Sequence, residues 1–203
     1  MPESADALLL IEIDGDKEIV EIIKTRLVNT CQKCRPLEIT FAKDEKEREE
    51  IWRVRRSVSP ALLSLRPGKI NEDVCVPRSR IAELVRHVTN IGKKHGILVA
   101  NFGHAGDGNI HVNFLIDRQD SSELFRAEKA VKELFKIVLH LGGTISGEHG
   151  IGIAKSPFLT WEVGEEGVRI MKRLKKVFDP NNILNPGKMV NPNWAFFSPK
   201  KRL

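Results

Sequence analysis

Two histidines beside an Asp-Gly pair are the first residues whose spacing could support chemistry. An Asp-Gly pair between two extended runs is typical of a two-residue β-hairpin turn, because that turn needs positive φ angles. With Asp107 and Gly108 in the turn, His104 lies directly opposite His111. Opposed residues have Cβ atoms about 4.5–5.5 Å apart, so both imidazoles could bind one ion, with Asn113 on the same sheet face. A pair of surface histidines beside a turn is the alternative.

A glutamate and a histidine follow in a glycine-rich loop, residues 142–152. This loop lacks the Gly-Lys-Ser/Thr of a phosphate-binding loop and the H-E-x-x-H helix of a zinc protease. A polar loop would explain Glu148 and His149 taken alone. Together with the hairpin, Glu148 completes a set of two histidines and one carboxylate, which suits a catalytic Zn, Mn or Fe ion. His149 is then a candidate general base, since imidazoles exchange protons near neutral pH.

The elements that must position these residues alternate between strands and helices. Apolar runs and alternation predict strands over residues 7–13, 37–42, 70–76, 97–102 and 110–116. Helical spacing predicts helices over residues 16–29, 79–94, 121–141 and 163–177, with a further helix beginning in 43–50. This order favours an α+β fold over a Rossmann sheet. We expect a ferredoxin-like antiparallel sheet with helices packed on one face and a helical C-terminal segment.

Composition excludes several classes of protein. The chain has 203 residues, of which 41% are hydrophobic and 30% charged, so neither a disordered nor a membrane-spanning class fits. The net charge of +6 comes without tyrosine or an RNA-binding aromatic motif, so we expect no nucleic-acid partner. Three cysteines and an N-terminus unlike a secretory signal favour a reducing, cytoplasmic location. Peripheral membrane association and homo-oligomerisation stay open.

Four motifs give the chain a family resemblance. They are residues 70–77 (INEDVCVP), 103–111 (GHAGDGNIH), 146–152 (SGEHGIG) and 179–188 (DPNNILNPGK). In this order, the motifs resemble the C-terminal domain of FAD-linked oxidases of the vanillyl-alcohol oxidase superfamily. The glycolate oxidase, D-lactate dehydrogenase and D-2-hydroxyglutarate dehydrogenase types are the most similar in pattern.

The resemblance implies a metal-dependent oxidation of a 2-hydroxy acid to a 2-oxo acid. It implies that His104, His111 and Glu148 ligate a divalent metal, which binds the carboxylate and hydroxyl of the substrate. It further implies that His149 removes the hydroxyl proton while a hydride passes to FAD. These roles agree with the acidity that a metal confers on a bound hydroxyl.

Other residues are assigned to substrate and cofactor by the same resemblance. Asn113 matches a substrate-contacting position, and Arg55 matches a residue that binds the substrate carboxylate, although a solvated helix charge is the alternative for Arg55. Asn71 stands where the 2-hydroxyglutarate enzymes have a substrate-binding lysine, and Lys69 is a substitute two residues earlier. A small acid such as D-lactate or glycolate therefore fits better than a dicarboxylate. Asn185 is expected to face the flavin.

The flavin-binding part of such enzymes has no counterpart in these 203 residues. We expect residues 1–160 to form the substrate and metal cap domain, and residues 161–203 to form a helix and tail that pack on a flavin domain. FAD is then held mainly by a missing domain or a separate FAD-binding subunit. A truncated, catalytically inactive metal-binding remnant is the alternative, and an independent metal hydrolase is a third.

Overall fold

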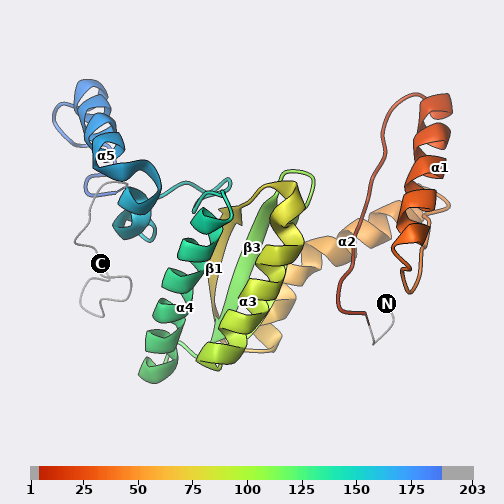
Figure 1. Cartoon of the computed structure of the whole chain (residues 1–203), viewed down its shortest axis with the longest axis horizontal. Helices are drawn as coiled ribbons and strands as arrows, with labels where there is room; N and C mark the ends of the chain where they lie inside the picture. The colour runs from red at the N-terminus through yellow and green to blue at the C-terminus, as the bar shows by residue number, and fades with distance from the viewer. Residues whose placement is uncertain (1–4, 189–203) are drawn as a thin grey trace. The chain divides into compact units, whose positions relative to one another are not determined.

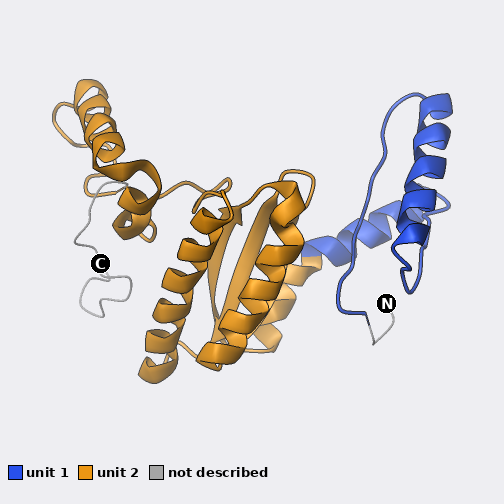
Figure 2. Cartoon of the chain, in the orientation of Figure 1, with its two compact units in different colours: residues 1–56 blue, residues 57–203 orange. Residues whose placement is uncertain are grey.

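The computed structural model describes residues 5–188, which fall into two compact units (Figures 1 and 2). The first unit is residues 1–56 and the second is residues 57–203. The predicted division of role near residue 160 falls inside the second unit and stays a prediction, and residues 189–203 of its tail lie outside the described residues. Within residues 5–188, no helix combines the length and apolar character needed to cross a bilayer.

The first unit contains helix α1 (Lys17–Lys33) and most of helix α2 (Glu45–Ala61), as the sequence predicts. Two side-chain bonds begin α2: Asp44 Oδ1 accepts the Glu47 amide at 2.8 Å as an N-cap, and Glu47 Oε2 accepts the Lys43 amide at 2.9 Å. Neither helix contributes a buried side chain among the residues described. Their apolar faces therefore have no core of their own within this unit.

The two strands predicted over residues 7–13 and 37–42 are wrong. Both segments run without a strand assignment, and several of their apolar side chains, including Leu8, Leu9 and Leu37, are exposed. A strand is defined by its ladder of hydrogen bonds to a neighbour. The described part of the chain gives these two segments no such ladder.

The second unit is built on a three-stranded antiparallel sheet in the order β1-β3-β2. Its main elements are β1 (Gly68–Cys75), α3 (Ile81–His95), β2 (Leu98–His104), β3 (Asn109–Ile116), α4 (Ser121–His140) and α5 (Leu159–Phe178). Short 3-10 helices lie at Leu62–Ser64, Arg78–Arg80 and Ser156–Phe158. Helix α3 connects β1 to β2 along the chain, and β3 lies between these two strands in the sheet. This is the split β-α-β arrangement of ferredoxin-like folds. The predicted α+β class is confirmed.

After α4 the chain returns to the outer edge of β1. There Thr144 and Cys75 form an isolated antiparallel bridge, with N–H···O distances of 2.8 and 3.1 Å. This bridge stands where a ferredoxin-like sheet has a fourth strand. It brings the glycine-rich loop of residues 142–152 to the edge of the sheet.

The helices α3 and α4 pack on one face of the sheet, and this face forms the core (Figure 1). The sheet contributes Val74, Val112 and Phe114, and α4 contributes Leu134 and Phe135 among other fully buried side chains. Because side chains alternate along a strand, Asp73, His111 and Asn113 face the opposite side. The helices thus bury one face and leave the other for polar groups.

The hairpin between β2 and β3 has a different register from the predicted one. His104 pairs with Asn109, and His111 pairs with Phe102, so four residues rather than two form the loop. The backbone turns through hydrogen bonds from Asp107 to His104 and from Gly108 to Ala105. The prediction of His104 directly opposite His111 is therefore wrong, but a shift of two residues keeps both on one face.

Candidate active site

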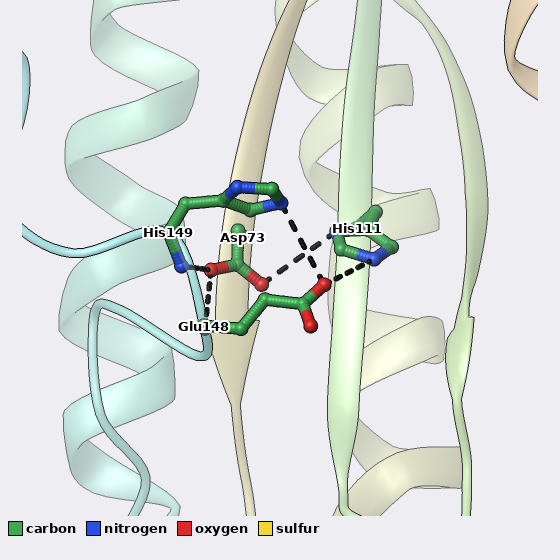
Figure 3. A group of neighbouring side chains, drawn as sticks. All are labelled: Asp73, His111, Glu148 and His149. Carbon is green, nitrogen blue, oxygen red and sulfur yellow. Dashed lines mark hydrogen bonds and ion pairs between the residues drawn. The ribbon is translucent and has the colours of Figure 1, made fainter.

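Three separate segments bring the candidate residues together on the polar face of the sheet (Figure 3). His111 lies on the central strand β3, directly opposite Asp73 on β1. Glu148 and His149 come from the loop that follows the bridge at Thr144. Each of these four residues offers one ligand atom, and the four atoms lie within 4.8 Å of one another.

Glu148 is the centre of this cluster. Its Oε1 lies 3.3 Å from His111 Nε2 and 3.6 Å from His149 Nε2. On the other side of the His111 ring, Nδ1 lies 3.6 Å from Asp73 Oδ1. The side chains of Glu148 and His149 are 52% and 64% exposed, whereas Asp73 and His111 are buried. Two members of the cluster are therefore buried against the sheet, and the other two are accessible to a substrate.

His104 is a neighbour of the cluster. It lies at the end of β2, exposed, and its ring meets that of His111 edge-on with centroids 5.8 Å apart. The His149 ring lies 5.6 Å from His111 on the same measure. The structure thus brings His111, Glu148 and His149 into one group and places His104 beside it.

Asp73 and its surroundings hold the loop in place. Its carboxylate accepts the amides of Glu148 at 2.7 Å and His149 at 2.9 Å, and the side-chain amide of Asn109 at 2.6 Å. A Cβ at Gly147 would lie 1.8 Å from Asn109 Nδ2 and 2.6 Å from Asp73 Oδ1, so any other residue would displace these two hydrogen-bonded side chains. The loop therefore approaches the sheet closely.

Burial and hydrogen bonding act differently on the two buried members. Burial lowers the pKa of His111. The charges of His104 and His149 lower this pKa further, and the carboxylates of Asp73 and Glu148 partly offset the decrease. Burial raises the pKa of Asp73, but hydrogen bonds from His149, Asn109 and Glu148 outweigh burial and keep this pKa below its usual value. Asp73 is thus an anion at neutral pH beside an imidazole that favours its neutral form, the form that binds metals.

The donor set fits a divalent metal ion. Two atoms bonded to tetrahedral zinc at about 2.1 Å lie about 3.4 Å apart, close to the 3.3 and 3.6 Å between Glu148 and the two histidines. Imidazole and carboxylate are also the ligand types of catalytic zinc, manganese and iron. In addition, Asn109 Oδ1 is buried beside Asp73 and accepts no hydrogen bond within the described residues.

The remaining predicted residues lie in different places. Asn113 is fully buried on β3, where its Oδ1 accepts the exposed Asn71 amide at 2.9 Å and its own amide donates to His111 and Ala100 carbonyls. Arg55 lies on α2 in the first unit. Asn185 lies in the turn after α5, at φ 48°, and accepts a hydrogen bond from Lys188. The cluster includes none of these four residues.

Asp73 is the member that the sequence interpretation missed. Strand alternation would have placed it on the face of His111 if the pairing of β1 with β3 had been foreseen. The available signal was that Asp73 lies within the INEDVCVP motif, one of the four that carry the family resemblance.

Comparison with known proteins identifies related sequences over almost the whole chain. The family described as "FAD linked oxidases, C-terminal domain" matches residues 1–189. The glycolate oxidase subunit GlcD of Bacillus subtilis is 44% identical over 189 residues, which are 93% of this chain and 40% of that protein. A mitochondrial D-lactate dehydrogenase [cytochrome] of Arabidopsis thaliana is 35% identical over 77% of this chain and 28% of its own length. The chain thus spans about two fifths or less of these relatives.

A solved structure shares the fold. The 4-ethylphenol oxidase of Gulosibacter chungangensis, in complex with isoeugenol, matches with a TM-score of 0.58 over 85% of this chain and 37% of that chain. The two are 17% identical, so this likeness concerns the fold alone.

Proposed function

The chain belongs to the family of FAD linked oxidase C-terminal domains, and we propose on this premise that it forms the substrate- and metal-binding part of a flavin-dependent 2-hydroxy-acid dehydrogenase or oxidase. The observation that carries the proposal is the convergence of His111, Glu148 and His149 on the polar face of the sheet. The product of the reaction is the corresponding 2-oxo acid.

We assign the metal to His104, His111 and Glu148, and the role of general base to His149. A bound divalent ion supplies Lewis acidity that lowers the pKa of a substrate hydroxyl. His149 Nε2 is well placed to take the hydroxyl proton, because its ring is 64% exposed while its backbone is fixed by Asp73. Its 3.6 Å approach to Glu148 also makes it the rival of His104 as a ligand.

The polar face favours a small monocarboxylate such as D-lactate or glycolate. Asn71 is neutral, and its amide is engaged by Asn113. Lys69 lies on the same face of β1, but its ammonium donates to the Ser59 hydroxyl at 2.6 Å and carbonyl at 3.1 Å. Neither Asn71 nor Lys69 therefore offers a cation to a second carboxylate of the substrate. Arg55 remains our candidate for binding the one carboxylate of the substrate, by a bidentate contact.

FAD, held by other segments of the protein or by a partner subunit, supplies the hydride acceptor. Helix α5, whose Ile170, Leu174, Val177 and Phe178 are exposed, is our candidate for contact with that flavin-binding part, together with Asn185. The family and the relatives named above support this arrangement. Three free cysteines agree with a reducing compartment such as the cytoplasm.

Metal analysis of single variants tests the site. We expect His104→Ala and Glu148→Ala to lose stoichiometric zinc or manganese, because each removes a ligand, and His149→Ala to retain it. His140→Ala is the control, since His140 is an exposed histidine at the end of α4. Equal metal loss in His149→Ala and Glu148→Ala would make His149 a ligand, and full retention in Glu148→Ala would refute the site.

Dye reduction tests the activity. The chain, combined with an FAD-bearing protein that co-purifies with it, is expected to reduce an acceptor dye with D-lactate or glycolate. His149→Ala should lower the rate by about 100-fold or more, as for loss of a general base. If the combined proteins bind FAD and metal yet oxidise none of the short 2-hydroxy acids, the proposed function is wrong and a binding role remains.

A further inference from the structure

We propose that Asp73 is a positioning residue that shapes the Glu148–His149 turn and orients His111, rather than a ligand of the metal. The inference rests on the proposed function where it concerns metal affinity, but its structural part does not. Asp73 lies on the edge strand β1, 2% exposed, between the loop and the central strand.

A single residue of β1 accepts the amides of three consecutive loop residues, 147–149. The Asp73 carboxylate accepts the consecutive amides of Glu148 and His149 on one oxygen, Oδ2. The Asp73 carbonyl accepts the Gly147 amide at 3.2 Å and the ammonium of the buried Lys155 at 2.6 Å. Asp73 thus contacts both ends of the segment that carries the candidate base and ligand.

The carboxylate has little capacity left for a metal ion. Oδ2 accepts two backbone donors, and Oδ1 accepts Asn109 Nδ2 at 2.6 Å. A carboxylate that turned toward a metal would leave these donors unsatisfied in a buried place, at a cost of about 1–3 kcal/mol each. Glu148 has a half-exposed side chain, and within residues 5–188 its Oε1 accepts no backbone amide, so turning it toward a metal carries no such cost.

Asp73 also faces the ring of His111. The 3.6 Å between Asp73 Oδ1 and His111 Nδ1 is too long for a hydrogen bond, but it favours a proton on Nδ1 by charge. Nε2, on the side of Glu148, is then the unprotonated nitrogen that can bind a metal. A carboxylate that accepts the second ring N–H of a metal-binding histidine orients it, and its loss typically costs about 10–100-fold in metal affinity; Asp73 is placed to accept this bond after a small movement of the ring.

Asp73→Asn is the direct test, because the side chain keeps its size while one oxygen becomes an N–H donor. That donor must face either the two backbone amides or Asn109 Nδ2. In the metal-free chain, we expect amide hydrogen exchange of Glu148 and His149, followed by NMR, to accelerate at least about tenfold relative to β3 amides. Zinc affinity, measured by calorimetry, should fall about 10–100-fold, and the His111 ring ¹⁵N shifts should change.

Glu123→Gln is the matched control, because Glu123 is also a buried carboxylate that accepts a backbone amide, from Asp117. It should leave the exchange of Glu148 and His149 unchanged. Unchanged exchange in Asp73→Asn, or the same acceleration in both variants, would overturn the inference. If the wild type binds no zinc, the proposed function fails, while the exchange result still decides the role of Asp73.

A measurement on the wild type covers the case in which Asp73→Asn does not fold. Scalar coupling across hydrogen bonds links an amide nitrogen to the carbon of its acceptor. We expect such couplings from the Glu148 and His149 nitrogens to Asp73 Cγ. If these couplings are absent from a spectrum that shows the couplings across the β3 ladder, the proposed role of Asp73 is refuted.

Discussion

Replacing Glu72 by glutamine should stabilise the protein at alkaline pH. Glu72 lies on β1 opposite Val112, on the face that packs against the helices, and is 2% exposed. Burial raises the pKa of its carboxyl from 4.5 to about 7, the charge of Asp73 adds to this, and Lys155 opposes it. The folded state therefore holds this proton more tightly than the unfolded chain does.

The sign and size follow from linkage. The stability contributed by the protonated carboxyl is complete below pH about 4.5 and is lost as the pH rises to about 7. At about 1.4 kcal/mol per pKa unit, the loss amounts to about 1 kcal/mol at pH 5 and about 3 kcal/mol at pH 8. Glutamine has a similar shape and no proton to lose. The advantage of Glu72→Gln should thus grow by about 2 kcal/mol between these pH values.

Urea unfolding followed by circular dichroism at pH 5 and pH 8 measures this difference. Exchange of β3 amides assigns the transition to the second unit. The attraction of Lys155 for the ionised carboxylate already contributes to the pKa of about 7, and any effect of the substitution that does not depend on pH cancels when the two pH values are compared. Glu165→Gln, at an exposed position on α5, should show no pH-dependent gap. A gap for Glu72→Gln that is equal at both pH values, within about 0.5 kcal/mol, would refute the reasoning.

Two further substitutions probe the loop and the core. Gly147→Ala should lower zinc affinity by at least about tenfold in calorimetry, because its Cβ would lie 1.8 Å from Asn109 Nδ2. Gly106→Ala is the control, since a Cβ there would meet no atom within 4 Å. Equal zinc affinities of the two variants would contradict the close approach of the loop. Phe135→Ala should lower the free energy of unfolding by about 3–5 kcal/mol in urea titrations. Phe125, on the same helix, is 59% exposed, so Phe125→Ala should change this free energy little. A loss below about 1 kcal/mol for Phe135→Ala would contradict its packing in the core.

Local patterns in the sequence predicted the helices and the β1, β2 and β3 strands well. Helical spacing acts over a few positions, so α1, α3, α4 and α5 lie within a few residues of their predicted bounds, and α2 begins where a helix start was predicted. The apolar runs at residues 7–13 and 37–42 misled, because an extended run becomes a strand only beside a partner. That partner is a property of the whole fold, which a local pattern does not contain.

The candidate site was predictable in its residue types and less so in its geometry. Alternation placed His111 and Asn113 on one face, but the Asp-Gly pair implied a turn that is two residues too short. Asp73 went unnoticed because its partners Glu148 and His149 are 75 and 76 residues away in sequence. Contacts of this range depend on where the chain returns after α4, and no local signal in the strand announces it.

The four-residue loop between His104 and Asn109 has a consequence for how this region tolerates changes in length. Hairpin loops of two to five residues can join the same pair of strands, so a change of one residue within positions 105–108 can be taken up by the loop while β2 and β3 keep their pairing. Inside β3 the same change would shift the register by one residue. That shift would carry Val112 and Phe114 to the polar face and His111 into the core, so changes in length are tolerated in the loop and not in the strand that follows it.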